Sequence, residues 1–349
     1  MLRPIDVLFI SMLVGLLFLP IWRAYLCSPG SHAAEATSIA SYGALLQPQE
    51  LPNRGVGVGF DLTAGYGTVA ISYHNGSTAN VARVNASETY HKTMSRLSRM
   101  SSRYRVSPAD ARALGDMIKD LRAEAEDFLE YPLSSVVGTI VNLEGLNGNT
   151  LDAAFEHAGL GVIQLRFFNY PAYETMTAYA GNGLGICSDY KNRTACKIER
   201  MAMQDIYVLS VLYTKTALTV ALTLMASAND LYEHPPLKVE DFTLGHDARH
   251  QNPNEKYYWE AVKDAVRRAV VWDVGPMRQP AKLLLFGESS GDAKFRAVLN
   301  ETCQELLEEL PQWYDNEPVF VAARGAAELA KRKPFDPWRP AVVQETVDL

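Results

Sequence analysis

Apolar and polar residues alternate along residues 56–84, and this period of two predicts β-strands. The alternating stretches are Val56–Leu62, Thr68–Tyr73 and Ala79–Val84, with the turn signals TAGYG and NGS between them. Consecutive antiparallel pairing is the simplest topology for such a series. Six glycines lie between positions 55 and 84, so the segment is either a phosphate-binding hairpin or only a glycine-rich ribbon.

The pattern then changes to a helical period at residue 107. Ser107 suits a helix N-cap, Pro108 suits the first helical position, and Asp110 can reach back to the cap. The apolar positions of this predicted helix recur at helical spacing: Leu114, Ile118, Leu121 and Phe128. A long helix is therefore expected from residue 108.

A strand, a helix and a strand are predicted next. The apolar run 134–145 indicates a buried strand, and NTLDAAFEHAGL indicates a helix capped at Asn149 or Thr150 and ended by Gly159. GVIQLRFFNYP then indicates another strand. This order and spacing predict a right-handed crossover and a mixed α/β sheet.

The second half of the chain repeats the scheme. DIYVLSVLYTK, TALTVALTLMAS and LKVEDFTLG are apolar strand-like runs, and a helix from about 254 to 270, the strand AKLLLFGES and the helix DAKFRAVLNETCQELLEEL follow them. A last helix, EPVFVAARGAAELAKR, precedes the tail. Three strands, a helix, a strand and a helix occur twice, which predicts two related lobes that face each other.

Composition agrees with a folded chain and argues against nucleic-acid binding. The 349 residues are 48% hydrophobic, enough for one large or two medium domains. The net charge is −7 with both signs mixed, whereas nucleic-acid-binding domains concentrate Lys and Arg. The basic segment 91–105 is interpreted as a solvated surface. We therefore expect no nucleic-acid partner.

The N-terminus carries a targeting signal. Residues 7–22 form an apolar segment that is long for a signal-peptide core and short for a membrane span. Trp22 suits an interfacial anchor, while Ser31-His32-Ala33 suits cleavage, so a signal anchor and a signal peptide both remain open for residues 1–26. A linker is expected at 27–53. We expect the secretory pathway, with a membrane-anchored lumenal or extracellular body, or secretion if the signal is cleaved.

Sequons and cysteines are compatible with this location. Four N-x-S/T sequons predict glycosylation: Asn75, Asn85, Asn192 and Asn300. Each is weak alone, but together with an export signal they favour a lumenal glycoprotein. Cys187 and Cys196 bracket one sequon in a polar loop and could form a local disulfide.

Four segments resemble the ATPase domain of the heat-shock protein 70 chaperones, within the actin-like ATPase superfamily. VGVGFDLTAGYGTVAIS is similar to the first phosphate hairpin, G-I-D-L-G-T-T-x-S. GLGVIQLRFFNYPAYETMTAYAGNG is similar to A-G-L-x-V-x-R-I-I-N-E-P-T-A-A-A-x-A-Y-G. AKLLLFGESSGDAKFRAVL looks like the adenosine-motif strand and helix, and NEPVFVAARGAAELAKR looks like the closing D-P-x-x-A-V-x-x-G-A-A helix.

The resemblance implies a two-lobed actin-like ATPase fold, of the duplicated ribonuclease H-like type, preceded by an N-terminal hydrophobic helix. Lobe I would span 54–200, lobe II 201–335 and a tail 336–349, with the outer subdomains reduced because the spacings between motifs are short. It also implies ATP or ADP with Mg²⁺ between the lobes, where a glycine-containing hairpin from each lobe faces the phosphates.

The first phosphate hairpin keeps part of the family's chemistry. Asp61 stands at the family's aspartate, which reaches the metal through water. Thr63, Ala64 and Gly65 stand at the phosphate turn, where the family has G-T-T, so phosphate-bonding hydroxyls are lost. Nucleotide binding at this turn is therefore expected to be weakened.

The other catalytic positions depart further from the family. The second hairpin, D-L-G-G-G-T-F-D in the family, falls on LYTKTALT, so that Leu212 and Thr219 replace its aspartates and Lys215 lies in the turn. Tyr170 replaces the glutamate of N-E-P, and a phenol with a pKa near 10 is no carboxylate at neutral pH. The resemblance therefore implies a loss of hydrolytic machinery.

The nucleoside side is better kept. Gly287, Glu288 and Ser289 follow a strand and would let the backbone approach a base or ribose, and Gly325 begins the small-residue run of the last helix. Ordinary strand-to-helix packing uses the same residues.

Other motifs are weaker. Gly55-x-Gly57-x-Gly59 lies within a strand and opens no helix, so it is no dinucleotide fingerprint. His246, Asp247 and His250 are interpreted as a polar loop rather than a metal site. GESSG resembles a nucleophile elbow around Ser289, but no histidine follows it in the sequence, which excludes a hydrolase triad.

Three functions follow. The first is a divergent pseudo-ATPase that does not hydrolyse, and that binds nucleotide weakly or uses its cleft for a protein partner. The second is a slow chaperone-type ATPase with Asp61 at the metal and Lys215 at the phosphates, although losing catalytic groups costs orders of magnitude in rate. The third is a different protein on a similar fold, such as a sugar kinase relative or a glycosylated secretory-pathway protein that uses the fold only as an interaction scaffold.

Overall fold

The computed structural model describes residues 55–100, 107–165, 171–229, 231–251, 254–271 and 278–338. The expected N-terminal hydrophobic helix (1–26), the linker (27–53), Tyr170 and most of the tail (336–349) lie outside these residues. Within them, no helix has both the length and the apolar character that a membrane span needs.

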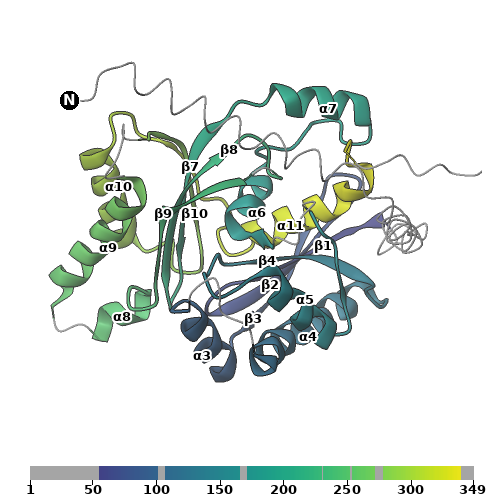
Figure 1. The fold of residues 1–349 in the computed structure, drawn as a ribbon, viewed down its shortest axis with the longest axis horizontal. Coiled ribbons are helices and arrows are strands. Elements are labelled where there is room, and N and C mark those ends of the chain that lie inside the picture. Colours follow the sequence, from purple (N-terminus) through teal and green to yellow (C-terminus); the bar gives the residue numbers. More distant parts are fainter. Residues whose placement is uncertain are drawn as a thin grey trace, which may run out of the picture. The chain divides into compact units, whose positions relative to one another are not determined.

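The first sheet is built from the first half of the chain, in the order β3-β2-β1-β4-β5 (Figure 1). The strands β1 (Gly57–Leu62), β2 (Tyr66–Ser72) and β3 (Thr78–Asn85) form an antiparallel meander. The strands β4 (Ser135–Ile140) and β5 (Gly161–Val162) extend it in parallel, and β6 (Ala172–Tyr173) also pairs with β4. The predicted meander and parallel crossover are confirmed.

The second sheet repeats this arrangement with the order β9-β8-β7-β10-β11. Its meander is β7 (Ile206–Tyr213), β8 (Leu218–Met225) and β9 (Leu231–Asp241). The strands β10 (Pro280–Phe286) and β11 (Gln312–Tyr314) continue it in parallel. The fold is therefore mixed α/β with two sheets of the same order and the same strand directions, as the repetition in the sequence predicts.

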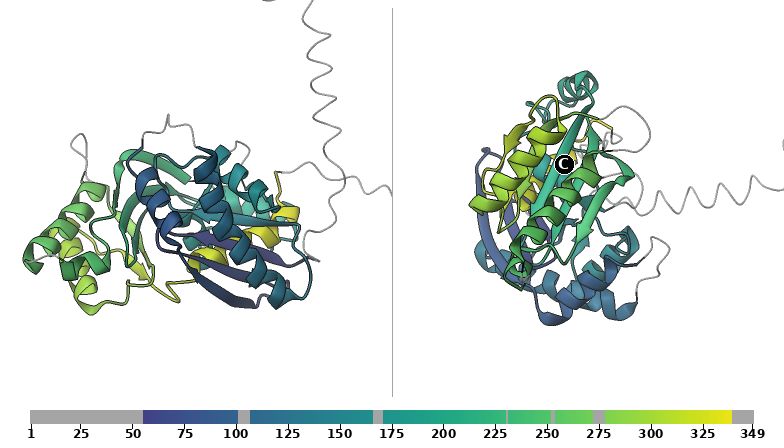
Figure 2. Two further views of the ribbon diagram at one scale, coloured as in Figure 1. Left: turned by 90° about the horizontal axis from the view of Figure 1, so that it is seen from below. Right: turned by 90° about the vertical axis from the view of Figure 1, so that its left-hand side faces the viewer.

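Helices cover the sheets and lie between them. In the first half the helices are α3 (Glu88–Leu97), α4 (Pro108–Leu129), α5 (Gly148–His157), α6 (Glu174–Gly181) and α7 (Arg193–Ala202). In the second half they are α8 (His246–Gln251), α9 (Glu255–Val270), α10 (Ala293–Leu306) and α11 (Val321–Arg332), which a short 3₁₀ turn (Lys333–Phe335) extends. The helices α9 and α10 share an apolar core with the second sheet, and Figure 2 shows them in green on one side of it.

The helices α6 and α11 pack against each other, and both lie between the sheets (Figure 1). Although α11 follows the second sheet in sequence, it packs on β1 of the first. Glycines allow this: a Cβ at Gly57 or Gly59 would lie 2.0 or 2.2 Å from the α11 backbone, and one at Gly325 would lie 1.7 Å from the carbonyl oxygen of Thr177 in α6. These glycines of the ribbon are therefore required by helix packing.

Local sequence signals are correct at some positions and wrong at others. Ser107 and Asp110 form a capping box at the start of α4, as predicted. The cap of α5 is Asn147 and neither of the predicted residues Asn149 and Thr150, because the Asn147 side chain accepts from the amide of Thr150. Phe128, predicted on the apolar face of α4, is 50% exposed, since it lies in the last turn of that helix, near its end.

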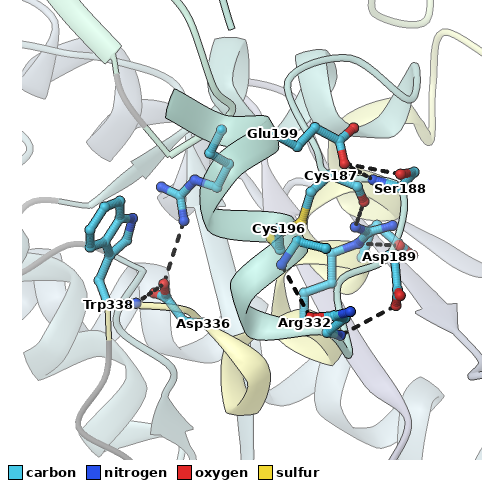
Figure 3. The surroundings of a disulfide bond; sticks show 12 residues. Cys187, Ser188, Asp189, Cys196, Glu199, Arg332, Asp336 and Trp338 are labelled. Atoms are coloured by element: carbon cyan, nitrogen blue, oxygen red, sulfur yellow. Dashed lines mark hydrogen bonds and ion pairs between the residues drawn. A yellow bond between two sulfur atoms is a disulfide. The ribbon is translucent and has the colours of Figure 1, made fainter. Parts of the chain in front are cut away.

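A disulfide joins Cys187 to Cys196 in α7, with Cα atoms 5.3 Å apart (Figure 3). Glu199 of α7 accepts hydrogen bonds at 2.9 Å from the amide and the hydroxyl of Ser188. Arg332 of α11 donates to the carbonyl oxygen of Cys187. These contacts hold α7 against the end of α11.

Candidate functional site

The turn between β1 and β2, residues 63–66, is closed by a threonine. The amide and the hydroxyl of Thr63 donate to the carbonyl oxygen of Tyr66 at 3.0 and 2.8 Å. Thr63 Oγ1 also accepts from the amides of Gly65 and Tyr66 at 3.2 and 3.1 Å. The predicted phosphate residues Thr63, Ala64 and Gly65 thus form this first turn, but its Gly65 amide bonds within the turn.

The turn between β7 and β8, residues 214–217, has the same pattern. The amide and the hydroxyl of Thr214 donate to the carbonyl oxygen of Ala217, both at 3.0 Å. Thr214 Oγ1 accepts from the amides of Thr216 and Ala217 at 3.3 and 3.0 Å. This second turn contains the predicted Lys215 and is the structural counterpart of the first.

The two turns contact each other directly. A Cβ at Gly65 of the first turn would lie 2.8 Å from Oγ1 of Thr216 in the second. The Thr216 side chain therefore fills the space in front of the glycine that was predicted to approach phosphate. Two hairpins that hold a nucleotide between them need that space, and in this arrangement a protein side chain occupies it.

Neighbouring helices hold each turn. Tyr90 of α3 is fully buried and donates to the carbonyl oxygen of Thr63 at 2.8 Å. The amides of His246 and Asp247, at the start of α8, donate to the carbonyl oxygens of Thr214 and Lys215 at 2.9 and 3.0 Å. The predicted polar loop at 246–250 is wrong, because this segment is a helix whose first amides support the second turn.

A buried pair of carboxyl groups lies beneath the first turn. Asp61 of β1 is 2% exposed and Glu174, the first residue of α6, is 4% exposed. The two side chains are hydrogen-bonded to each other, and the Leu62 amide also bonds Asp61. Two carboxyl groups in contact share a proton more readily than they hold two charges, so this pair is a proton-sharing pair.

Burial raises both pKa values. It raises the pKa of Asp61 to about 7, although the hydrogen bonds from Glu174 and the Leu62 amide act in the opposite direction. Burial, and then the charges of Asp61 and Glu240, hold the pKa of Glu174 well above its usual value. Both carboxyl groups are therefore harder to ionise in the folded chain than in water.

The space between the sheets beside this pair is small. A cavity of about 20 Å³ is lined by residues of both halves, including Glu174, Thr175, Ser210 and Lys238. Lys238 of β9 donates to the carbonyl and side-chain oxygens of Asn142 at 2.8 and 3.1 Å, and it pairs with Glu240 at 2.8 Å. The cavity has room for about one water molecule, whereas ligand pockets measure about 300–1,000 Å³.

The residues predicted on the nucleoside side, Gly287 to Ser289, follow β10 and pack against the end of β7. Gly287 has φ +99°, and a Cβ there would lie 2.4 Å from the carbonyl oxygen of Tyr213. The Ser289 amide donates to that same oxygen at 3.1 Å. The Glu288 carboxylate accepts from the Lys215 amide at 3.0 Å and pairs with Arg83. The structure thus brings these residues to the second turn, where they bond protein groups.

The described part of the chain contains no cluster of metal ligands, and its larger hollows lie away from the two turns. No group of three or more His, Cys, Asp or Glu side chains there could hold a metal ion. Hollows of about 790 and 440 Å³ lie between α4 and α5 and beside β5. Neither of these hollows adjoins the two turns.

The four sequons differ in their surroundings. Asn75 is exposed at the β2–β3 turn, and its Oδ1 accepts from the hydroxyl of Ser77 at 2.7 Å. Asn85 is exposed at the end of β3, and Asn192 is exposed as the N-cap of α7. Asn300 is half-buried within α10, two residues before a fully buried threonine.

Reasoning from the sequence missed Glu174, Arg83 and Lys238. Glu174 is the acidic residue at the start of an otherwise uncharged helix, and that contrast is the signal that could have indicated it. Arg83 and Lys238 lie in strands, where a single basic residue is a common surface feature, so no pattern marked them.

Comparison with known proteins identifies no family for this chain. No protein-family model matches the chain, and no curated protein matches it. The resemblance to the heat-shock protein 70 ATPase domain therefore stays a prediction.

Proposed function

We propose that this chain is a pseudo-ATPase of the actin-like type, which does not hydrolyse nucleotide and acts by binding a protein partner. The repeated sheet order supports the fold, because two copies of one strand arrangement are what a duplicated lobe requires. The resemblance of the four sequence segments supports the family. The function rests on one observation, the contact between the first and second turns.

Three features of the site favour loss of hydrolysis. Thr216 fills the space in front of Gly65, and Glu288 accepts a hydrogen bond from the Lys215 amide. The second hairpin has Leu212 where a metal-binding carboxylate is expected, and Leu212 is 3% exposed. Mg²⁺ prefers six oxygen ligands with several waters, and a cavity of about 20 Å³ does not accommodate that group. The residues present do not fit Mg²⁺ with ATP in this arrangement.

Calorimetry of the full-length chain with ATP or ADP, with and without Mg²⁺, tests the proposal. We expect no turnover above the spontaneous rate and no binding heat at millimolar nucleotide. Mg²⁺-dependent turnover that Asp61→Ala abolishes would support a slow ATPase instead. Asp116→Asn, at an exposed carboxylate of α4, is the matched control and should change neither measurement.

A second candidate, the slow ATPase, is favoured by one observation. Asp61 Oδ1 and Glu174 Oε1 have no hydrogen-bond partner among the described residues. Two carboxyl oxygens at the expected metal position could serve a cation if the turns separated. The calorimetric experiment with Asp61→Ala distinguishes the two functions.

We also propose that the chain is a glycoprotein of the secretory pathway, with its body in the lumen or outside the cell. The exposed positions of Asn75, Asn85 and Asn192 support this, and a short-range disulfide is compatible with an oxidising compartment. Glycosidase treatment of the expressed protein should increase its electrophoretic mobility. Unchanged mobility would contradict the proposed location.

A further inference from the structure

Edge strand β3 of the first sheet is bridged to the second half of the chain by a buried carboxylate. Glu288 is 7% exposed at its side chain and pairs with Arg83 of β3, which is 32% exposed. The same carboxylate accepts from the Lys215 amide of the second turn at 3.0 Å. Arg83 also lies over the ring of Tyr66, 4.5 Å from its centre. One carboxylate thus joins a strand of one sheet to the turn of the other.

A β-bulge in β3 orients this bridge. The register shifts between Val69 and Ala70, which pair with Ala82 and Asn80, so Val81 is the extra residue. Because of that extra residue, Asn80 and Arg83 lie on the same exposed face although they are three positions apart.

A second contact runs beside the first. The side-chain amide of Asn80 donates to Glu317 at 3.0 Å, and Glu317 also pairs with Arg324 of α11. The hydrogen bond from Asn80, together with Arg324, holds the pKa of Glu317 below its usual value. The bulged strand therefore makes two polar contacts with the second half of the chain.

The donors around Glu288 are those that bind oxyanions. A guanidinium and a turn amide that converge on one carboxylate form charge-assisted hydrogen bonds, and the same donors bind phosphate or an external carboxylate. Tyr66 holds the guanidinium in place, so removal of the Glu288 side chain would leave the donors oriented.

We propose that Arg83 and the Lys215 amide form an oxyanion site that the chain itself occupies with Glu288. An external oxyanion, either a phosphate group or a carboxylate, binds by displacing Glu288 and takes its place between Arg83 of β3 and the amide of the second turn. The inference rests on the proposed function, since it identifies what keeps the two turns together. A tethered carboxylate competes at an effective concentration in the millimolar range, so the unmodified chain binds small oxyanions weakly.

The experiment measures binding of inorganic pyrophosphate and of glutarate to full-length Glu288→Ala by calorimetry. We expect the variant to bind at least one of them about tenfold more tightly than the unmodified chain does. The gain should disappear in the double variant Arg83→Gln/Glu288→Ala. A gain with pyrophosphate alone identifies a phosphate ligand, and a gain with glutarate identifies a carboxylate. Glu317→Gln is the matched control, because it removes the charge of the neighbouring contact and leaves Glu288 in place.

Amide hydrogen exchange in residues 214–217 shows whether the turn is released. We expect faster exchange in Glu288→Ala and unchanged exchange in Glu317→Gln. If the turn is released and neither oxyanion binds more tightly, the oxyanion site is refuted. Glu288→Gln, which keeps the size of the side chain, replaces the alanine variant if that variant does not fold. ATP turnover by the unmodified chain would refute the proposed function but would leave this result readable on its own.

Discussion

The hairpins β1–β2 and β7–β8 have the same turn, but different side chains lie beneath it. Both turns are closed by a fully buried threonine with four equivalent hydrogen bonds. Two residues before that threonine, the first hairpin has Asp61 and the second has Leu212. The first is bonded to Glu174, whereas the second packs in the apolar core that both sheets share. The two hairpins thus share one backbone frame, while the chemistry beneath it differs.

The same difference extends down the strands. The backbone of α11 packs directly against Gly57 and Gly59 of β1. The counterparts in β7 are Val208 and Ser210, whose side chains are buried. Ser210 bonds the Thr175 hydroxyl at 2.8 Å. The backbone of a helix therefore contacts the first hairpin directly, whereas side chains occupy the equivalent positions of the second hairpin.

The largest expected loss of stability comes from placing a carboxylate beneath the second turn, as Asp61 lies beneath the first. Leu212→Asp places a carboxylate in an apolar, buried position near Glu174, and we expect a loss of about 3–5 kcal/mol of unfolding free energy. Urea unfolding measures this loss. Leu212→Met is the matched control and should cost less than about 1.5 kcal/mol. A loss below about 1 kcal/mol for Leu212→Asp would mean that the position admits water, contrary to the described packing.

Stability should fall with rising pH because of the acid pair. The pKa of Asp61 is about 7 in the folded chain against a usual value of 3.8, so between these values the folded state binds more protons than the unfolded state does. Stability is then present at low pH and decreases as pH rises through about 7. We therefore expect the free energy of unfolding to be lower at pH 8 than at pH 5.

Variants of the pair test that slope. Asp61→Asn should reduce the slope, and the buried Glu174 should keep its own part of it. Asp120→Asn, at an exposed position of α4, should leave the slope nearly unchanged. Urea unfolding at pH 5, 6, 7 and 8 provides the comparison. Equal slopes in the unmodified chain and in Asp61→Asn would show that the carboxyl pair does not share a proton.

The two turns should respond equally to loss of their threonines. Thr63→Ala and Thr214→Ala each remove an acceptor of two amides and a donor to a carbonyl oxygen, so each should cost about 1–2 kcal/mol. Thr63→Ser and Thr214→Ser keep the hydroxyl but remove a buried methyl group, so each should cost about 0.8 kcal/mol and less than the alanine variant at the same position. A difference of more than about 1 kcal/mol between the two alanine variants would contradict the equivalence of the turns.

Local patterns predicted much of the fold. Alternation indicated the meander β1–β3, and the capping box at Ser107 indicated the start of α4, because both signals depend on residues close in sequence. The α5 cap was misplaced since Asn147 and Asn149 are chemically equivalent, and only the backbone distinguishes them. The repeat of strand order was visible because each strand has its own apolar run.

The site was less predictable because it depends on tertiary contacts. Gly65 has the same sequence context whether it faces phosphate or Thr216. Glu288 was expected near a nucleoside, but its actual partner, Arg83, lies 205 positions away. The packing of α6 brings the carboxyl group of Glu174 to Asp61, and no local sequence pattern predicts that packing.

The two turns contact each other and leave no room for a ligand between Gly65 and Thr216. A double-mutant cycle of Gly65→Ala and Thr216→Ala measures this contact by urea unfolding. A methyl group at Gly65 would meet Thr216 Oγ1 at 2.8 Å, so we expect Gly65→Ala to be about 1 kcal/mol more costly with Thr216 present than in Thr216→Ala. Additive effects, with a coupling below about 0.3 kcal/mol, would show that the turns are apart and that the space between them is open to a ligand.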